Sequence, residues 1–383
     1  GGTLLEWRSY PTKLYFPPPL PSDVHSKMDC QNSKISAKKR RYNIVALLNT
    51  NMTESIFDNH GRIINYARIA VTDRCNLRCF YCMPEEGIQY MPKKELLQFE
   101  ELERLTKILT ELGISKLRIT GGEPFVRKDI MKFIESIHTL PHLKEIHITT
   151  NGTHTADIIP ELKRLGIKSV NLSLDTLDAA RFFEITRRDL FSTVYNTLEA
   201  LIHHGIPTKI NAVVMANKNI DDLIPLCELT KNTPVSVRFI EEMPFNGTGS
   251  HYEHLQWNHI NILNYIKDKF PTLSKLEDPR YSTSSNYKIP GYKGDIGIIA
   301  AYSRTFCGTC NRIRITPQGT LKTCLYDHGV FNLRDLMRND ATDEQIKSAL
   351  KQSFSHRAKD GWEAEKNREA FFPATESMST IGG

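Results

Sequence analysis

Three closely spaced cysteines constrain this chain more than any other feature of its sequence. Cys75, Cys79 and Cys82 have the spacing C-x3-C-x2-C and directly follow an apolar, β-branched run. Three thiolates this close together indicate a loop folded around one metal centre at the end of a strand. A structural zinc site has four protein ligands, and a ferredoxin-type [4Fe–4S] cluster has four cysteines. The spacing therefore predicts a cubane cluster with one iron left for another ligand, and a zinc knuckle is the alternative.

A second group of three cysteines lies toward the end of the chain. Cys307, Cys310 and Cys324 have the spacing C-x2-C-x13-C, which alone fits half of a zinc ribbon as well as a second cluster. Six of the eight cysteines fall into these two groups, a pattern of metal ligation in a reducing compartment rather than of disulfides. Of the others, Cys227 is expected to be a core residue, and Cys30 has no assignment.

The composition fits a soluble globular protein and limits its partners. Of 383 residues, 40% are hydrophobic and 25% are charged, and no apolar run approaches the roughly 18 to 20 residues that span a bilayer. We therefore expect no membrane partner. The net charge of +6 suits nucleic acid and a small polyanion equally. A nucleic-acid-binding protein with two metal knuckles would gather basic residues among aromatics, whereas here they lie in predicted strands, so we expect no nucleic-acid partner.

Residues 1–60 differ from the rest of the chain. They include a proline-rich stretch and a basic run, with few acidic residues, and such a segment cannot build a core. An acid-poor leader with Arg and Ser resembles an organelle transit peptide, and the alternative is a plain disordered extension. We interpret these residues as a disordered or targeting extension.

From Arg68 onward, short β-branched runs alternate with amphipathic helical patterns. Strands that alternate with helices predict a parallel sheet, and six units are too few to close an eight-stranded barrel. In such a sheet the active site lies at the C-terminal ends of the strands. The predicted strands are 68–72, 116–120, 145–149, 169–173, 209–214 and 235–240, and the predicted helices are 100–112, 129–137, 157–165, 190–204 and 221–231.

Polar or glycine-bearing segments follow four of these strands, at 121–124, 149–152, 173–176 and 241–244. Glycines let the backbone come close to a ligand. Beyond them, Arg312 and Arg314 alternate along a further predicted strand, 312–316. Their side chains therefore share one face, and two guanidinium groups on one face suit a phosphorylated substrate.

The motifs TDRCNLRCFYCMP, RITGGEP, TTNG, LSLDT, RFIEEMPFNG and CGTCNRIRIT, in this order, resemble those of the radical S-adenosylmethionine (SAM) GTP 3',8-cyclases. This family catalyses the first step of molybdenum cofactor biosynthesis, and the resemblance runs from about Gly61 to Arg334. It implies an α/β fold in which an incomplete (βα)6 TIM-like radical SAM barrel, residues 61–245, precedes a C-terminal region, 246–383, that carries a second cluster and a Gly-Gly tail.

The resemblance also implies a lyase reaction and its cofactors. Two [4Fe–4S] clusters and SAM would be bound, and a SAM-derived 5'-deoxyadenosyl radical would abstract H3' of GTP. The product would be (8S)-3',8-cyclo-7,8-dihydroguanosine 5'-triphosphate. The alternative is another radical SAM enzyme whose auxiliary cluster lies beside a phosphorylated substrate.

Site residues follow from the matched motifs. A buried arginine without a counter-charge is costly, so basic residues within strands point to an anionic ligand, although each alone could be a surface charge. The implied cluster ligands are Cys75, Cys79, Cys82, Cys307, Cys310 and Cys324; SAM would contact Tyr81, Gly122, Glu123, Ser173 and Met243; GTP would contact Arg68, Arg118, Thr149, Lys209, Arg312 and Arg314.

The chain ends in Gly382-Gly383, and the resemblance implies that this tail reaches into the active site as a catalytic element; a free end is the alternative. The implied partners are GTP, an electron donor and, downstream in the pathway, cyclic pyranopterin monophosphate synthase. The family also allows a homodimer. Its eukaryotic members imply the mitochondrial matrix, and the cytoplasm is the other expected location.

Overall fold

The computed structural model describes residues 55–245, 255–367 and 376–382. All of them belong to one compact unit, Thr53–Gly383. The extension expected over residues 1–60 lies almost wholly outside the described residues. No helix in the described part of the chain has the length and apolar character to cross a bilayer.

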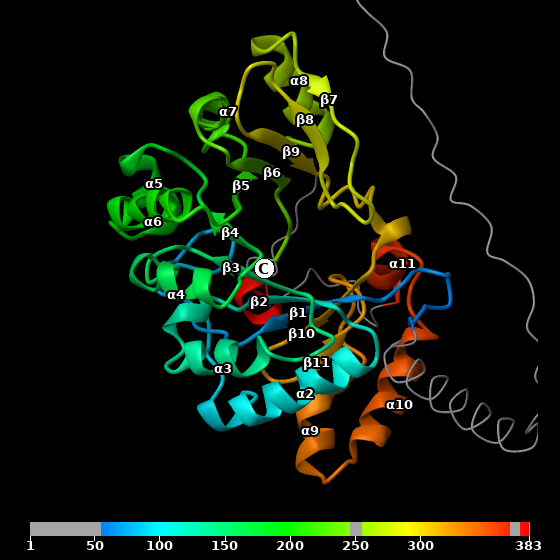
Figure 1. Cartoon of the computed structure of the whole chain (residues 1–383). Helices are drawn as coiled ribbons and strands as arrows, with labels where there is room; N and C mark the ends of the chain where they lie inside the picture. Colours follow the sequence, from blue (N-terminus) through cyan, green and yellow to red (C-terminus); the bar gives the residue numbers. More distant parts are fainter. Residues whose placement is uncertain (1–54, 246–254, 368–375, 383) are drawn as a thin grey trace, which may run out of the picture. The chain divides into compact units, whose positions relative to one another are not determined.

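Six parallel strands form the centre of the sheet, as predicted (Figure 1). Five begin within one residue of the predicted position, whereas β1 begins two residues earlier than predicted. Val71 and Thr72, which were predicted as strand, belong to the following loop, where the side chains of Thr72 and Asp73 accept hydrogen bonds from the amides of Arg74 and Met91. The six strands are β1 (Tyr66–Ala70), β2 (Lys116–Thr120), β3 (Glu145–Thr150), β4 (Ser169–Ser173), β5 (Thr208–Val214) and β6 (Ser236–Glu241).

The C-terminal region adds strands to both sides of this sheet. β10 (Arg312–Ile315) pairs parallel with β1, and β9 (Asp295–Ile299) pairs parallel with β6. Antiparallel strands follow on each side, so that the order is β12-β11-β10-β1-β2-β3-β4-β5-β6-β9-β8-β7. The outer strands are β7 (Ser274–Lys275), β8 (Ser285–Lys288), β11 (Thr320–Lys322) and β12 (Phe331–Asn332). The expected fold class is confirmed, although the parallel part is longer than six strands.

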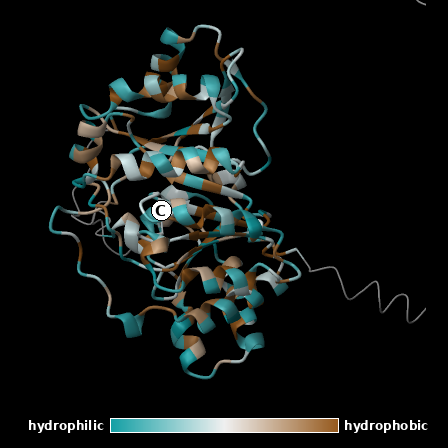
Figure 2. Ribbon diagram, turned by 60° about the vertical axis from the view of Figure 1, so that its left-hand side comes forward, coloured by the Kyte–Doolittle hydropathy of each residue, from teal (hydrophilic) through white to brown (hydrophobic). Residues whose placement is uncertain are grey.

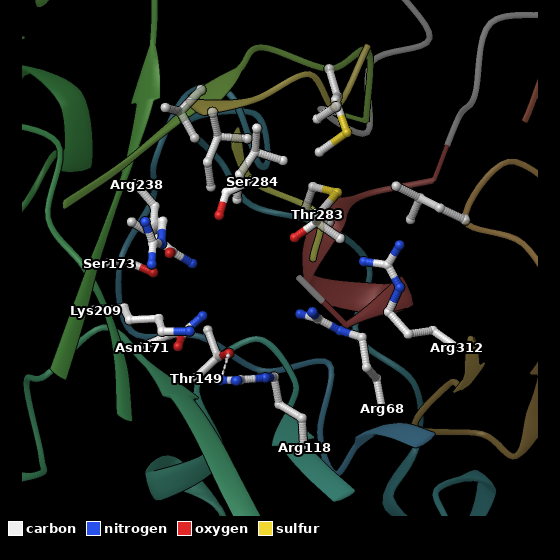
Figure 3. A pocket seen from close by; sticks show the side chains of 18 of the residues that line it. Arg68, Arg118, Thr149, Asn171, Ser173, Lys209, Arg238, Thr283, Ser284 and Arg312 are labelled. Atoms are coloured by element: carbon white, nitrogen blue, oxygen red, sulfur yellow. Dashed lines mark hydrogen bonds between the residues drawn. The ribbon is translucent and has the colours of Figure 1, made fainter. Parts of the chain in front are cut away.

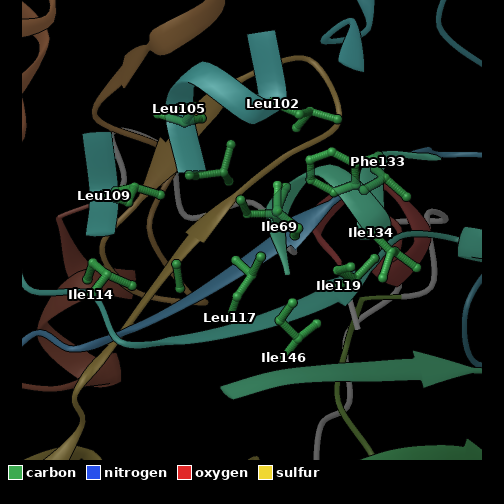
Figure 4. Packing of buried hydrophobic residues seen from close by; sticks show 14 of the residues in the cluster. Ile69, Leu102, Leu105, Leu109, Ile114, Leu117, Ile119, Phe133, Ile134 and Ile146 are labelled. Carbon is green, nitrogen blue, oxygen red and sulfur yellow. The ribbon is translucent and has the colours of Figure 1, made fainter. Parts of the chain in front are cut away.

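Helices cover the sheet and bury one apolar face each. In α2 (Phe99–Glu111), the buried residues Leu102, Leu105, Ile108 and Leu109 recur at helical spacing, and Figure 4 shows three of them above β1 and β2. Figure 2 shows hydrophilic and hydrophobic residues interspersed along the helices. The other helices are α3 (Ile130–Ile137), α4 (Ile159–Arg164), α5 (Ala179–Thr186), α6 (Phe191–His203), α7 (Leu223–Asn232), α8 (His259–Lys269), α9 (Leu333–Arg338), α10 (Asp343–Phe354), α11 (Gly361–Lys366) and α12 (Met378–Ile381).

Two hydrophobic clusters hold the helices on the strands. One joins β1–β4 to α2, α3, α9 and α10, and the other joins β4–β6 and β9 to α5–α8. Cys227 is a buried member of the second cluster, as expected. Because both clusters lie on the helix side, the opposite faces of the strands carry polar side chains that line a cavity.

Candidate functional site

One cavity of about 480 Å³ is lined by all six cysteines of the two groups. Cys75, Cys79 and Cys82 come from the loop after β1, whereas Cys307 and Cys310 precede β10 and Cys324 follows β11. Because β1 and β10 pair in parallel, the first group lies beyond the C-terminal ends of these strands and the second group lies at the N-terminal end of β10, and the cavity extends between them. The two cysteine groups therefore face a common space.

The loop with the first cysteine group is held by its own backbone and by the end of β3. The amide of Cys82 donates to the carbonyl of Cys79 at 2.9 Å, and Arg78 Nη1 donates to the carbonyl of Cys75 at 2.8 Å. Asn151 Nδ2 lies 3.6 Å from Cys75 Sγ. Burial raises the pKa of the Cys75 thiol to about 11, so a positive metal centre is needed to hold it as a thiolate.

The three thiols of each cysteine group line the cavity wall. Among the described residues, no three His, Cys, Asp or Glu side chains could hold one metal ion. A zinc ion needs its ligands about 2.3 Å from one centre, whereas each cysteine of a cubane binds a different iron. Each cysteine group offers three thiols to the cavity, which fits a cubane that leaves one iron for another ligand.

Four of the five residues expected to contact SAM line the cavity: Tyr81, Gly122, Ser173 and Met243. Tyr81 donates to Asp175 Oδ2 at 2.8 Å, and the other oxygen of Asp175 accepts from the amide of Val213 at 2.8 Å. A Cβ at Gly122 would lie 2.4 Å from the carbonyl oxygen of Arg74. Only glycine therefore lets the end of β2 approach the cysteine loop this closely.

Glu123 lies behind the cavity wall instead. Its carboxylate is fully buried and accepts hydrogen bonds from Thr150 Oγ1 at 2.8 Å, the amide of Asn151 at 2.6 Å and the amide of Phe125 at 3.1 Å. Burial raises its pKa to about 7. In this structure Glu123 braces the ends of β2 and β3, and its direct contact with SAM stays a prediction.

All six residues expected to contact GTP line the same cavity, and Figure 3 labels Arg68, Arg118, Thr149, Lys209 and Arg312 among them. Strand register brings three of them together, because Arg68 lies opposite Arg118 on one side and Arg314 on the other. Arg118 Nη1 donates to Thr149 Oγ1 at 3.4 Å. Burial and the nearby Arg238 lower the pKa of Lys209 to about 8. These strands thus carry a dense group of buried cations.

Carboxylates in the cavity wall do not neutralise these cations. Among the described lining residues, the acidic ones are Asp175 and Glu241. Asp175 is bonded as above, and Glu241 accepts hydrogen bonds from the amides of His259 and Ser303, each at 2.7 Å. The wall therefore carries more cationic than anionic side chains, and this excess favours a polyanionic ligand.

Several lining residues were not predicted. Tyr66 accepts a hydrogen bond from Arg118 Nε at 2.7 Å. Asn171 and Asn211 line the cavity and have buried Oδ1 atoms without a hydrogen-bond partner. Their positions could have been found, because each lies two residues from a predicted site residue on the same strand, Ser173 or Lys209, and so shares its face.

Arg357 supports the second cysteine group from behind. Its Nη2 donates to Cys310 Sγ at 3.2 Å and to the carbonyl of Arg312 at 2.8 Å, and its Nε donates to the carbonyl of Thr323 at 2.9 Å. Burial acts to raise the pKa of Cys310, but Arg312 and Arg357 outweigh it and lower the pKa to about 6. Arg357 lies in a loop between α10 and α11, and the sequence gives no signal for it.

The end of the chain lies against the open ends of β1 and β2. Gly382 has a φ of +77°, and a Cβ there would lie 2.7 Å from Thr120 Oγ1. Its carbonyl accepts a hydrogen bond from Arg314 Nη1 at 2.6 Å. In Figure 3 the red ribbon of this segment lies beside Arg68 and Arg312. Gly383 lies outside the described residues.

Comparison with known proteins gives two family matches. The model of the radical SAM superfamily matches residues 69–230, and the model described as Molybdenum Cofactor Synthesis C matches residues 235–362. Among solved structures, SuiB of Streptococcus suis has a TM-score of 0.52 at 15% identity, over 86% of this chain and 75% of that one. This likeness supports the fold alone.

Curated relatives cover most of the chain. It is 43% identical to molybdenum cofactor biosynthesis protein 1 of Drosophila melanogaster, over 75% of this chain and 51% of that protein. It is 38% identical to the mitochondrial GTP 3',8-cyclase of Arabidopsis thaliana, over 78% and 77%, and 40% identical to the GTP 3',8-cyclase of Clostridium perfringens (strain SM101 / Type A), over 77% and 91%. The chain thus spans about half the length of the animal relatives it matches.

Proposed function

As this chain belongs to the radical SAM family of GTP 3',8-cyclases, we propose that it is itself a GTP 3',8-cyclase, which forms (8S)-3',8-cyclo-7,8-dihydroguanosine 5'-triphosphate. The observation that carries this proposal is the single cavity shared by two cysteine groups and a set of buried cations. A radical source and a polyanionic nucleotide both need such a space. Relatives of this name are matched over most of their length.

Membership in the radical SAM superfamily implies SAM and an iron–sulfur cluster. We assign the first [4Fe–4S] cluster to Cys75, Cys79 and Cys82, and a second to Cys307, Cys310 and Cys324. When bound, the first cluster and SAM supply a 5'-deoxyadenosyl radical that removes H3' from the ribose of GTP.

The chain's own residues bind and orient the reactants. Tyr81, Ser173 and Met243 would contact SAM from three different segments of the wall. Gly122 has no side chain, so the backbone at this position can approach SAM closely. Glu123 supports these residues from behind the cavity wall, because its carboxylate fixes the ends of β2 and β3. Holding the reacting atoms in one geometry is a large part of what such a site can contribute to the rate.

The cations bind the nucleotide. Arg68, Arg118, Lys209, Arg312 and Arg314, with Thr149, offer donors from five strands to a triphosphate. A forked guanidinium gives two parallel hydrogen bonds to a phosphate, so the arginines fix orientation as well as charge. The guanine end would lie at the second cluster, as the resemblance to the family implies. Gly382 and Gly383 would complete the site beside Arg314.

Partners and location extend the same proposal. The reaction needs an electron donor, and we propose that the product passes to cyclic pyranopterin monophosphate synthase. The Arabidopsis thaliana relative is named as mitochondrial, and residues 1–60 suit a targeting extension, so we propose the mitochondrial matrix. A homodimer is the assembly to test first.

The test is a complete reaction without oxygen. The reconstituted protein is incubated with SAM, GTP and a strong reductant, and the products are analysed by mass spectrometry. We expect 5'-deoxyadenosine and a cyclised nucleotide in equal amounts, and about eight iron atoms per chain, four per cubane. ATP in place of GTP is the control and should give no cyclised product. Tight zinc at either cysteine group, or 5'-deoxyadenosine without a cyclised nucleotide, would contradict the proposal.

A further inference from the structure

The last described segment, residues 376–382, forms a strap along the cavity wall, from Lys322 on β11 to Arg314 on β10. It begins at an ion pair: Lys322 Nζ donates to both carboxylate oxygens of Glu376, at 2.8 and 2.7 Å. The side chain of Lys322 is 0% exposed and that of Glu376 is 32% exposed. A lysine buried this deeply needs an anionic partner. Glu376 therefore ties the strap to β11, two residues before Cys324.

The next residue ties the strap to the other cysteine group. Ser377 Oγ donates to the carbonyl of Cys82 at 2.6 Å and accepts from the amide of Ser379 at 3.2 Å. The amide of Met378 donates to the carbonyl of Phe245 at 3.0 Å, just after β6. Two consecutive side chains thus bind segments that lead to the two separate cysteine groups.

Strand register adds an electrostatic reason for this arrangement. Arg314 and Lys322 lie directly opposite each other on β10 and β11, and like charges in that position destabilise a strand pair. The strap serves both of them, because Glu376 binds Lys322 and the carbonyl of Gly382 binds Arg314. Its two ends therefore stabilise the strand pair that carries Arg312 and leads to Cys324.

From these contacts we propose that Glu376 and Ser377 are positioning residues, which fix the separation of the two cysteine groups by fastening the strap to both. This inference rests on the proposed function in one respect, that the groups hold clusters. A loosened strap leaves SAM and iron bound, but it lets the radical source and the nucleotide drift apart. Because transfer between them depends on close placement, SAM would then be cleaved without nucleotide cyclisation more often.

The test compares Glu376→Gln and Ser377→Ala with Glu344→Gln in the full reconstituted protein. Glu344 is an exposed residue of α10 that pairs with Lys347, so its change removes the same charge away from the cavity. Hydrogen exchange should become roughly tenfold faster in the strap of the first two variants, with iron content unchanged. The ratio of 5'-deoxyadenosine to cyclised nucleotide should rise severalfold from one. Glu376→Asp, which keeps the charge, should restore both measures in part.

Unchanged strap exchange in Glu376→Gln and Ser377→Ala would overturn the inference, and so would faster exchange with an unchanged product ratio. A failure of the proposed function is distinguishable, because the unaltered protein would then form no cyclised nucleotide. In that case the spin–spin coupling between the two reduced clusters tests the positioning role of Glu376 and Ser377. A weaker or broader coupling in the two strap variants than in Glu344→Gln supports the positioning role, and equal coupling refutes it.

Discussion

The phenol of Tyr66 accepts a 2.7 Å hydrogen bond from Nε of Arg118 on the neighbouring strand. Lys116 lies over the ring of Tyr66, 5.2 Å from its centroid, and Arg312 is its register partner on β10. Tyr66 therefore lies against Arg118 and Arg312, two of the cations that we assign to GTP, and against Lys116. This contact leads to a prediction about pH.

We expect GTP binding to take up protons above neutral pH. Burial acts to raise the pKa of Tyr66, but Arg118, Arg68 and Arg312 outweigh it and lower the pKa to about 7. A bound triphosphate adds negative charge and raises the pKa of Tyr66 again. GTP therefore binds better to the protein with a protonated phenol, and the affinity for GTP falls as pH rises past 7. Lys209, with its pKa near 8, contributes in the same direction.

Calorimetry at pH 8.5 in two buffers of different ionisation enthalpy measures the uptake. Terminal phosphates, with a second pKa of about 6, are already ionised there. Tyr66→Phe should lower the number of protons taken up on GTP binding and leave only the part that Lys209 contributes. Equal uptake in both proteins would show that Tyr66 does not titrate on binding.

Arg312→Ala and Arg314→Ala should each weaken GTP binding by roughly 1 to 3 kcal/mol, the usual cost of a lost hydrogen bond to a charged group. SAM binding should stay unchanged, because the SAM residues come from other segments. Anaerobic titration with each ligand measures both. Arg164→Ala, in an exposed pair with Glu161, is the matched control. Unaltered GTP affinity in both cavity variants would remove their phosphate role.

Gly122→Ala should reduce both stability and SAM affinity. The added Cβ would lie 2.4 Å from the carbonyl of Arg74, so the cysteine loop must move, at a cost of about 1 to 3 kcal/mol. The control is Gly166→Ala, where a Cβ meets nothing within 4 Å and the cost is backbone strain at a φ of +72°. Thermal unfolding and SAM titration measure the effects, and equal SAM affinity in the two variants contradicts the prediction.

Arg357→Ala should release the second cluster selectively. The change removes donors to Cys310 Sγ and to the carbonyls of Arg312 and Thr323, while the first cysteine loop keeps its contacts. Iron analysis should give about four atoms per chain instead of eight, and SAM should still bind. Loss of all iron, or no loss, would contradict a selective role for Arg357.

Local residue patterns predicted the positions of individual strands and helices. The strands 116–120 and 169–173 were predicted to the residue, because polar and apolar residues alternate along them with the period of a strand. The partner of a strand is a long-range property, so nothing local to Arg312 indicated that β10 would pair with β1. The eight-residue α5 (Ala179–Thr186) was missed, whereas the equally short α3 was predicted. The reason is that four apolar residues recur at helical spacing in α3, whereas in α5 the buried apolar residues are only Phe182 and Ile185.

The residues of the candidate site were likewise predicted where they belong to a local motif and missed where they do not. Residues in dense motifs, such as Cys75 and Arg314, were predicted and line the cavity. Arg357 was not, because a single arginine in a loop far along the chain has no pattern around it. Glu123 was assigned to SAM from its motif, but a motif does not reveal which way a carboxylate points.

Within the described residues the sheet does not close on itself, and its pairing order ends at β7 on one side and β12 on the other. Each of these outermost strands is only two residues long, Ser274–Lys275 and Phe331–Asn332. A long bare strand would expose a row of amide and carbonyl groups and could recruit a strand from another molecule, which is how many open sheets aggregate. Such brief outer strands offer little template for that, so this protein can keep an open barrel without inviting sheet-to-sheet association.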